Sequence, residues 1–281
     1  MTVKQDWFNT PDGAHIYYES RGSGPLTVIF APGFASSTRY FCKNIPVIAE
    51  KYRVVSFDPR GYGMSSAPLV GNNLTGHATD IKNLIDYLEL EDVVLIGWSC
   101  GGGISVQYSK LFKDHKLKAI GILDSHIHMM NDGDWNIHPN KGYKVRQMKK
   151  NYWAWLKGPE GMHLNTAFGP ANKDANLPPE LDPEDEKNFA EDCEMFFPWA
   201  GIELQIDYNL TNNLPQLSKI TVPVILYQSP LYGEKLWEIY DREIKTYHEL
   251  HKFESSHYLF YHEADRFNEI TLKFLEKLQS M

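Results

Sequence analysis

The sequence has few cysteines, no long hydrophobic run and no surplus of basic residues. Its 281 residues include only three cysteines, Cys42, Cys100 and Cys193, and none of them lies in a C-x-x-C motif. This odd number argues against a disulfide framework and favours a reducing compartment. No stretch approaches the roughly 18 consecutive apolar residues of a membrane-spanning helix, and the polar segment 1–11 lacks the apolar core of a signal peptide. We therefore expect a cytoplasmic protein without a membrane span.

The charge balance is acidic, and the composition allows a large core. Lys and Arg total 28 against 36 Asp and Glu, which gives a formal net charge of −8. Nucleic-acid-binding surfaces are typically basic, so this balance argues against a nucleic-acid partner. Hydrophobic residues make up 42% and aromatic residues 13% of the chain, which is too much for a disordered protein. Neither length nor composition indicates the oligomeric state.

Apolar, β-branched runs alternate with helical patterns along most of the chain. This alternation predicts an α/β fold, with a mostly parallel central sheet and helices on both faces. The expected strands are 15–20, 26–31, 53–58, 93–97, 117–123, 222–227 and 249–253. The expected helices are 37–50, 75–88, 102–111, 234–244 and 264–279.

Residues 127–213 form a different kind of segment between the two parts of this α/β core, 1–126 and 214–281. The segment lacks strand alternation and is dense in aromatic residues, among them Trp153 and Trp155. Aromatic side chains bury large areas and commonly line apolar pockets. We therefore predict a helical cap over a substrate pocket, with Trp153, Trp155, Trp98 and Tyr258 as candidate lining residues.

The most informative motif is Gly97-Trp98-Ser99-Cys100-Gly101, a G-x-S-x-G sequence between an apolar run and a helical pattern. A strand–turn–helix context is what gives this motif its meaning. The turn is strained, and glycines on either side leave room for the neighbouring backbone. Ser99 is therefore the predicted nucleophile.

A serine nucleophile needs a base and an acid that orients the base. His257 follows the last expected strand, and loops at the carboxyl ends of parallel strands converge on one crevice, so His257 is the predicted base. Asp124 ends the expected strand 117–123 and is the predicted acid. Glu234, which begins the helix 234–244, is the alternative acid.

The developing oxyanion needs backbone donors. The amide of Cys100, which follows the nucleophile, is the first predicted donor, and the amide of Phe34, in the loop after strand 26–31, is the second. We expect Cys100 to be present for its fit at the helix start and not as a reactive thiol. The pair His126 and His128 lacks a third ligand at a supporting spacing, so we expect neither a metal nor a cofactor.

Several segments together resemble the α/β-hydrolase fold superfamily. They are 31–35 (APGFA), 57–65 (FDPRGYGMS), 97–103 (GWSCGGG) and His257 before the final helix. The resemblance implies an α/β-hydrolase fold with a cap domain. The superfamily covers many chemistries, so the fold leaves the substrate open.

The elbow is similar to that of small esterases and of non-haem haloperoxidases, which normally have an Asp after the penultimate strand. Here that position reads Gln228-Ser229-Pro230, and the predicted acid is Asp124. This placement, with Trp155 in the inserted segment, also resembles cofactor-free dioxygenases that open 3-hydroxy-4-quinolone rings. Those enzymes commonly carry histidine where this chain has Cys100 and Pro32.

The leading expectation is a carboxylesterase-like serine hydrolase that acts on a small apolar ester, thioester or lactone. The first alternative is a cofactor-free dioxygenase that uses the same three residues. The second alternative is a non-catalytic ligand receptor on the same fold.

Overall fold

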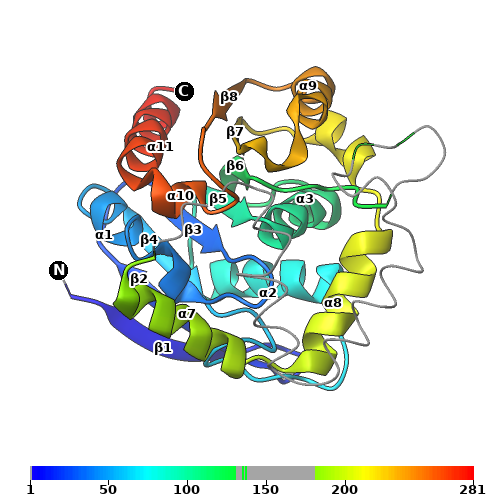
Figure 1. Ribbon diagram of the computed structural model, residues 1–281. Coiled ribbons are helices and arrows are strands. Elements are labelled where there is room, and N and C mark those ends of the chain that lie inside the picture. Colours follow the sequence, from blue (N-terminus) through cyan, green and yellow to red (C-terminus); the bar gives the residue numbers. More distant parts are fainter. Residues whose placement is uncertain (1, 131–134, 136, 138–180) are drawn as a thin grey trace.

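The computed structural model describes residues 2–130, 135, 137 and 181–281, apart from the side chain of Cys193. Eight strands form one sheet in the order β1-β2-β4-β3-β5-β6-β7-β8 (Figure 1). The strands β1 and β2 are antiparallel to their neighbours, and the strands from β4 through β8 pair in parallel. Their bounds are β1 Lys4–Asn9, β2 His15–Arg21, β3 Thr27–Ala31, β4 Arg53–Phe57, β5 Val93–Trp98, β6 Leu117–Leu123, β7 Val224–Gln228 and β8 His248–Lys252.

Helices cover both faces of the sheet, as the parallel strands require. One face carries α2 (Leu74–Tyr87), α3 (Cys100–Phe112) and α9 (Glu234–Glu243). The other carries α1 (Ile45–Ile48), α10 (Leu259–His262) and α11 (Ala264–Gln279). Within the described ranges, no helix is both long and apolar enough to cross a membrane.

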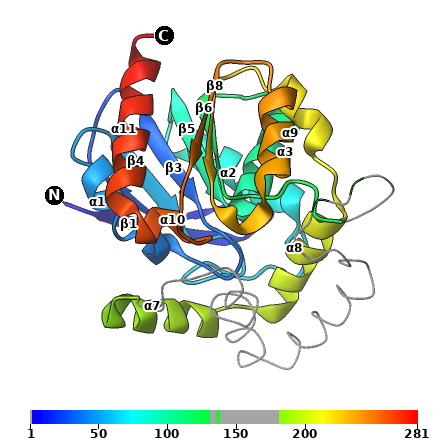
Figure 2. The ribbon, with the colours of Figure 1, turned by 45° about the horizontal axis from the view of Figure 1, so that its top comes forward.

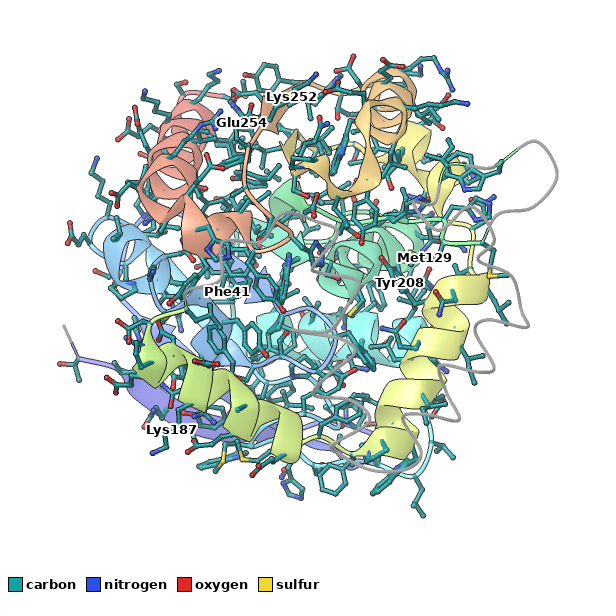
Figure 3. The ribbon with its side chains drawn as sticks, viewed as in Figure 1. Phe41, Met129, Lys187, Tyr208, Lys252 and Glu254 are labelled. Atoms are coloured by element: carbon teal, nitrogen blue, oxygen red, sulfur yellow. The ribbon has the colours of Figure 1, made fainter. Side chains whose placement is uncertain are left out.

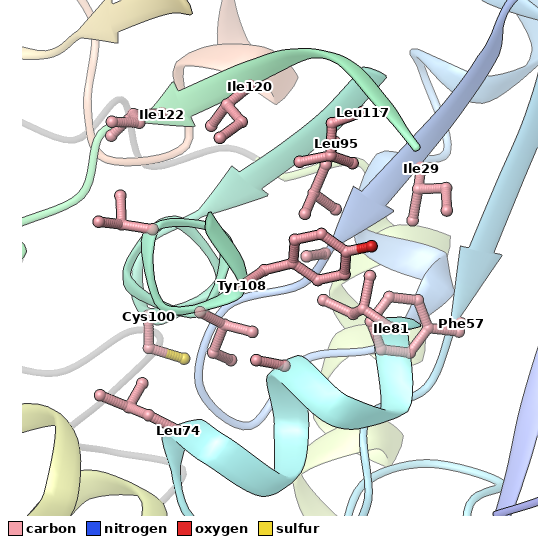
Figure 4. Packing of buried hydrophobic residues seen from close by; sticks show 14 of the residues in the cluster. Ile29, Phe57, Leu74, Ile81, Leu95, Cys100, Tyr108, Leu117, Ile120 and Ile122 are labelled. Carbon is pink, nitrogen blue, oxygen red and sulfur yellow. The ribbon is translucent and has the colours of Figure 1, made fainter. Parts of the chain in front are cut away.

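Alternation along the strands divides the core into two apolar clusters. In β5, Leu95 belongs to the cluster under α2 and α3, whereas the next residue, Ile96, belongs to the cluster on the other face. Successive side chains of a strand point to opposite faces, so one strand supplies both clusters. Figure 4 shows part of the first cluster, in which Leu95 of β5 lies beside Tyr108 of α3, and Phe57 of β4 lies beside Ile81 of α2.

The structure confirms the predicted α/β architecture. The strand 117–123 and the helix 264–279 have the expected bounds, and the other expected strands differ by one or two residues at their ends. The expected helix 37–50 is wrong, because two short helices, η1 (Thr38–Phe41) and α1, replace it. Asn44 lies between them. Its side-chain amide donates to the backbone carbonyl of Phe260 at 2.8 Å and to Oδ1 of Asn268 at 3.0 Å.

The edge strand β1 was not predicted. Of its six residues only Phe8 is buried, so it lacks the alternation of apolar side chains by which a half-buried strand is recognised. The short helix α10 was also missed, and its four residues are too few for a helical period to show.

The predicted cap, residues 127–213, is described in part. Its described helices are α7 (Pro183–Glu194) and α8 (Pro198–Leu210), and a turn of 3-10 helix, η2 (Leu214–Lys219), follows them. Figure 2 shows α7 beyond one end of the strands. The aromatic residues Trp153 and Trp155 lie outside the described residues, and the boundaries of the cap stay a prediction.

The buried centre of the sheet predicts a measurable stability difference. Ile120→Ala removes a fully buried side chain from β6 and is expected to lower the free energy of unfolding by about 2–5 kcal/mol. Leu69→Ala, at a residue that is 86% exposed, is expected to change it by less than about 0.5 kcal/mol. Chemical denaturation followed by circular dichroism measures both, and equal losses would contradict this account of the core.

Candidate active site

Ser99 lies on a sharp turn between β5 and α3, with backbone angles φ 54° and ψ −123°. A side chain on either flanking glycine would not fit, since a Cβ on Gly97 would lie 2.1 Å from the Gly101 carbonyl oxygen. A Cβ on Gly101 would lie 2.3 Å from the carbonyl oxygen of Ala31. The turn is held to the sheet by the Ser99 N–H, which donates to the Leu123 carbonyl at 2.9 Å. A strained residue fixed in this way has the geometry of a nucleophile elbow.

Asp124 and His257 are in direct contact. Asp124 follows β6 and is fully buried, and its Oδ2 lies 2.6 Å from Nδ1 of His257. A carboxylate accepts hydrogen bonds, so in this contact Nδ1 carries a proton and donates it to Asp124; in the neutral imidazole, Nε2 is then the acceptor. The His257 side chain is 16% exposed. The structure thus brings together the predicted acid and the predicted base, and their catalytic roles stay a proposal.

Ser229, which follows β7, is the site residue that the sequence analysis missed. Its N–H donates to Oδ1 of Asp124 at 2.9 Å, and its hydroxyl donates to Oδ2 at 2.7 Å. The strands β6 and β7 pair with Leu123 opposite Tyr227, so the residues that follow them lie side by side. The sequence signal that could have identified Ser229 is a polar residue directly after the strand that neighbours β6.

The alternative acid, Glu234, does not contact His257. It begins α9, its side chain is 65% exposed, and its carboxylate pairs with Lys252. Glu234 and Lys235, the first two residues of α9, are both exposed, whereas Leu236 and Trp237 of the same turn are buried. The expectation that Glu234 could replace Asp124 is therefore wrong on geometric grounds.

Aromatic side chains surround the imidazole. The indole N–H of Trp98 donates to the carbonyl of His257 at 2.9 Å, and the two rings are 5.1 Å apart. Tyr232, at the end of η3 (Pro230–Tyr232), lies 6.0 Å from the His257 ring and perpendicular to it. Trp98 and Tyr258 are almost fully buried and pack on each other at 4.9 Å. They support the loop that carries His257, and their predicted pocket role stays a prediction.

The two predicted oxyanion donors lie on segments that meet at Ser99. Cys100 is the first residue of α3, so its N–H has no acceptor within the helix and lies at the positive end of the helix dipole. Phe34 follows Gly33, at which a Cβ would lie 3.2 Å from the Cβ of Ser99. The loop that carries Phe34 is therefore packed against the nucleophile. The role of these two amides stays a proposal.

The thiol of Cys100 is unsuited to be a nucleophile. Cys100 is buried, and this burial raises the pKa of its thiol to about 12. The reactive form of cysteine is the thiolate, which is scarce at neutral pH when the pKa is that high. Burial thus argues against a reactive thiolate at Cys100, and its presence for fit stays a prediction.

Around the two histidines after Asp124, the described residues form no recognisable metal site. In the described part of the chain, no group of three or more His, Cys, Asp or Glu side chains could hold a metal ion. The carbonyl of His126 accepts a hydrogen bond from the Tyr208 hydroxyl at 2.8 Å. This contact joins the segment after β6 to α8.

The hydrogen bonds of Ser229 predict a stability effect. Ser229→Ala removes the hydroxyl that donates to the buried Asp124 carboxylate and is expected to lower the free energy of unfolding by about 1–3 kcal/mol. The control Ser218→Ala removes an exposed hydroxyl that donates to the Pro215 carbonyl and is expected to change little. Urea denaturation measures the free energy of unfolding of both variants. A Ser229→Ala variant as stable as the control would contradict the stabilising role of the hydrogen bond between Ser229 and Asp124.

Comparison with known proteins agrees with this architecture. The model of the alpha/beta hydrolase fold family matches residues 27–264. A putative non-heme chloroperoxidase of Synechocystis is 36% identical over 110 residues, which cover 38% of this chain and 38% of that protein. The matches to the curated relatives span 27% to 42% of those proteins' own length.

Solved structures match over nearly the whole chain. An esterase from Exiguobacterium antarcticum superposes with a TM-score of 0.83 at 22% identity, covering 97% of this chain and 100% of that one. A bromoperoxidase from Bacillus anthracis superposes with a TM-score of 0.83 at 20% identity and with the same coverage. At sequence identities this low, the structural similarity shows only that the fold is shared. Together with the family model, it shows that this chain belongs to the alpha/beta hydrolase fold family.

Proposed function

We propose that the protein is a carboxylesterase-like serine hydrolase that acts on a small apolar ester, thioester or lactone. The observation that carries the proposal is the 2.6 Å contact between the buried Asp124 carboxylate and Nδ1 of His257. His257 follows β8 and Ser99 follows β5, so both lie where loops at the carboxyl ends of the strands converge. Ser99, His257 and Asp124 then make a complete triad.

The proposed reaction uses each group in turn. His257 takes the proton of the Ser99 hydroxyl at Nε2, and the serine oxygen attacks the carbonyl carbon. The resulting oxyanion accepts hydrogen bonds from the amides of Phe34 and Cys100. Asp124 stabilises the imidazolium, which then gives its proton to the leaving group. A water molecule, activated by His257, releases the acyl group from Ser99.

The apolar character of the substrate is inferred from the side chains beside the oxyanion loop. Phe34 lies edge-on to Phe196 at 5.3 Å, and Phe196 stacks on Tyr62 at 5.1 Å. Phe196 lies between α7 and α8, so the inserted segment contributes to this aromatic cluster. Apolar side chains beside the oxyanion loop favour substrates with little charge. The cap of residues 127–213, with Trp153 and Trp155, is part of this proposal.

Active-site labelling tests the nucleophile. A fluorophosphonate probe is expected to label the wild-type protein at Ser99, and the protein is expected to hydrolyse p-nitrophenyl acetate. Ser99→Ala is expected to abolish labelling and to lower kcat by about 10⁴-fold or more. The control Ser109→Ala, at a residue of the helix α3 that follows Ser99, whose hydroxyl accepts from Gln216, is expected to be labelled like the wild type. Labelling that survives in Ser99→Ala would contradict the assignment.

Exchange of each carboxylate for its amide tests the acid. Asp124→Asn keeps the shape of the side chain but no longer fixes the tautomer of His257, so kcat is expected to fall by about 10⁴-fold. Glu234→Gln, at the exposed alternative, is expected to leave kcat unchanged. Steady-state ester hydrolysis measures both. A large loss in Glu234→Gln, or none in Asp124→Asn, would contradict the proposed role of Asp124.

A cofactor-free dioxygenase is the second candidate function. The position of Asp124 after β6, with Ser229 after β7, favours it, because that placement of the acid resembles the enzymes that open 3-hydroxy-4-quinolone rings. In that reaction His257 removes the hydroxyl proton of the substrate and Ser99 assists its binding. Oxygen uptake with a 3-hydroxy-4-quinolone in the absence of metal, lost in His257→Ala but largely kept in Ser99→Ala, would replace the hydrolase proposal. Ligand binding without any turnover would instead indicate a receptor.

A further inference from the structure

The loop 32–37 carries one of the proposed oxyanion donors and has an unfavourable backbone conformation. Ala35 has φ 53°, in the left-handed region that residues other than glycine rarely adopt. Such a conformation persists only where the surroundings fix it. Inside the loop, the Ser36 hydroxyl donates to the Gly33 carbonyl at 2.8 Å. Other restraints act where the loop enters η1.

Two buried carboxylates hold the exit of the loop. Asp58, after β4, accepts from the N–H of Thr38 at 2.9 Å. Asp192, from α7, accepts from the hydroxyl of Ser37 and pairs with the Arg39 guanidinium at 2.6 Å. The Ser37 hydroxyl also accepts from the Arg39 N–H at 3.1 Å. Asp58 belongs to the α/β core, close to Ser37 in the sequence. Asp192 lies in α7, 155 residues after Ser37.

The helix α7 has other contacts that do not involve the loop 32–37. Phe189 stacks on Tyr40 with ring centroids 4.1 Å apart. Asp185 accepts a hydrogen bond from the Tyr261 hydroxyl at 2.7 Å. In Figure 3, Lys187 marks the outer side of the same helix. The docking of α7 therefore does not depend on Asp192 alone. The Asp192 side chain, which is 1% exposed, also contacts the loop 32–37 through the Ser37 hydroxyl.

We propose that Asp192 is a positioning residue for the oxyanion hole. Through Ser37 it fixes the end of the loop 32–37, which keeps Ala35 in its left-handed conformation and holds the Phe34 amide beside Ser99. The helix α7 thereby supplies part of the arrangement on which acyl transfer depends, in addition to covering the core. This inference rests on the proposed hydrolase function, because the position of the Phe34 amide matters only if an oxyanion forms.

The kinetic test compares Asp192 with a second carboxylate of the same helix. Asp192→Ala is expected to lower kcat for p-nitrophenyl acetate by about 10- to 100-fold, because one oxyanion donor is misplaced, while KM changes less than about threefold. Asp192→Asn keeps an acceptor for Ser37 and is expected to restore most of kcat. The control Asp185→Ala removes the contact with Tyr261 and is expected to keep kcat. Equal losses in Asp192→Ala and Asp185→Ala would show that only helix docking matters, and would overturn the proposal.

A double-mutant cycle tests whether Asp192 acts through Ser37. Ser37→Ala alone is expected to lower kcat to a similar extent as Asp192→Ala, and the double variant is expected to be no slower than either single variant. Losses that multiply in the double variant would mean that the two residues act independently, which contradicts the proposed route. Ser37→Ala also keeps the test valid if Asp192→Ala does not fold.

Backbone hydrogen exchange separates this inference from the proposed function. Without any substrate, the amides of residues 34–38 are expected to exchange faster in Asp192→Ala than in the wild type, and at the wild-type rate in Asp185→Ala. Unchanged exchange in Asp192→Ala would overturn the positioning role even if the protein is an esterase. A wild-type protein that hydrolyses no ester would overturn the proposed function. In that case, faster amide exchange in Asp192→Ala would still support the proposal that Asp192 restrains the loop 32–37.

Discussion

The buried carboxylate of Asp124 is the point at which the separate parts of the site are joined. It accepts hydrogen bonds from the backbone and the hydroxyl of Ser229 and lies against Nδ1 of His257. A charge buried so completely is costly unless it is paired and hydrogen-bonded. The end of β6, the end of β7 and the loop after β8 must therefore meet at this carboxylate. The site has a defined geometry because these three segments satisfy one charge.

The parallel sheet brings these segments together at one edge, and strained backbone conformations occur close to them. The strands β5, β6, β7 and β8 are consecutive neighbours, so their carboxyl ends lie along one edge. Ser99 directly after β5, Asp124 directly after β6 and Ala35 in the loop after β3 are residues other than glycine with a positive φ. Strain of this kind persists where surrounding contacts over-determine the backbone, and it tends to gather at functional sites.

Local patterns were enough to predict the central strands, the α/β class and the elbow, because strand periodicity and the two glycines around Ser99 are properties of short segments. The same patterns failed for β1, whose exposed edge has a single buried side chain. They also failed for the expected helix 37–50, where the contacts of Asn44 with Phe260 and Asn268 replace helical continuation. Within 37–50, Pro46 at the start of α1 also opposes a continuous helix, because proline has no N–H for helical hydrogen bonding.

The sequence by itself determined the sheet, the position of Ser99 on a strained turn, and the presence of Asp124 and His257 at strand ends. Only the tertiary structure decided that Asp124 contacts His257 while Glu234 pairs with Lys252. It alone revealed that Ser229 donates hydrogen bonds to Asp124 and that the Ser37 hydroxyl donates to Asp192. The reason is distance along the chain: Asp124 lies 133 residues from His257 and 105 from Ser229. Such pairs are set by the register and packing of whole strands and helices, which no local pattern encodes.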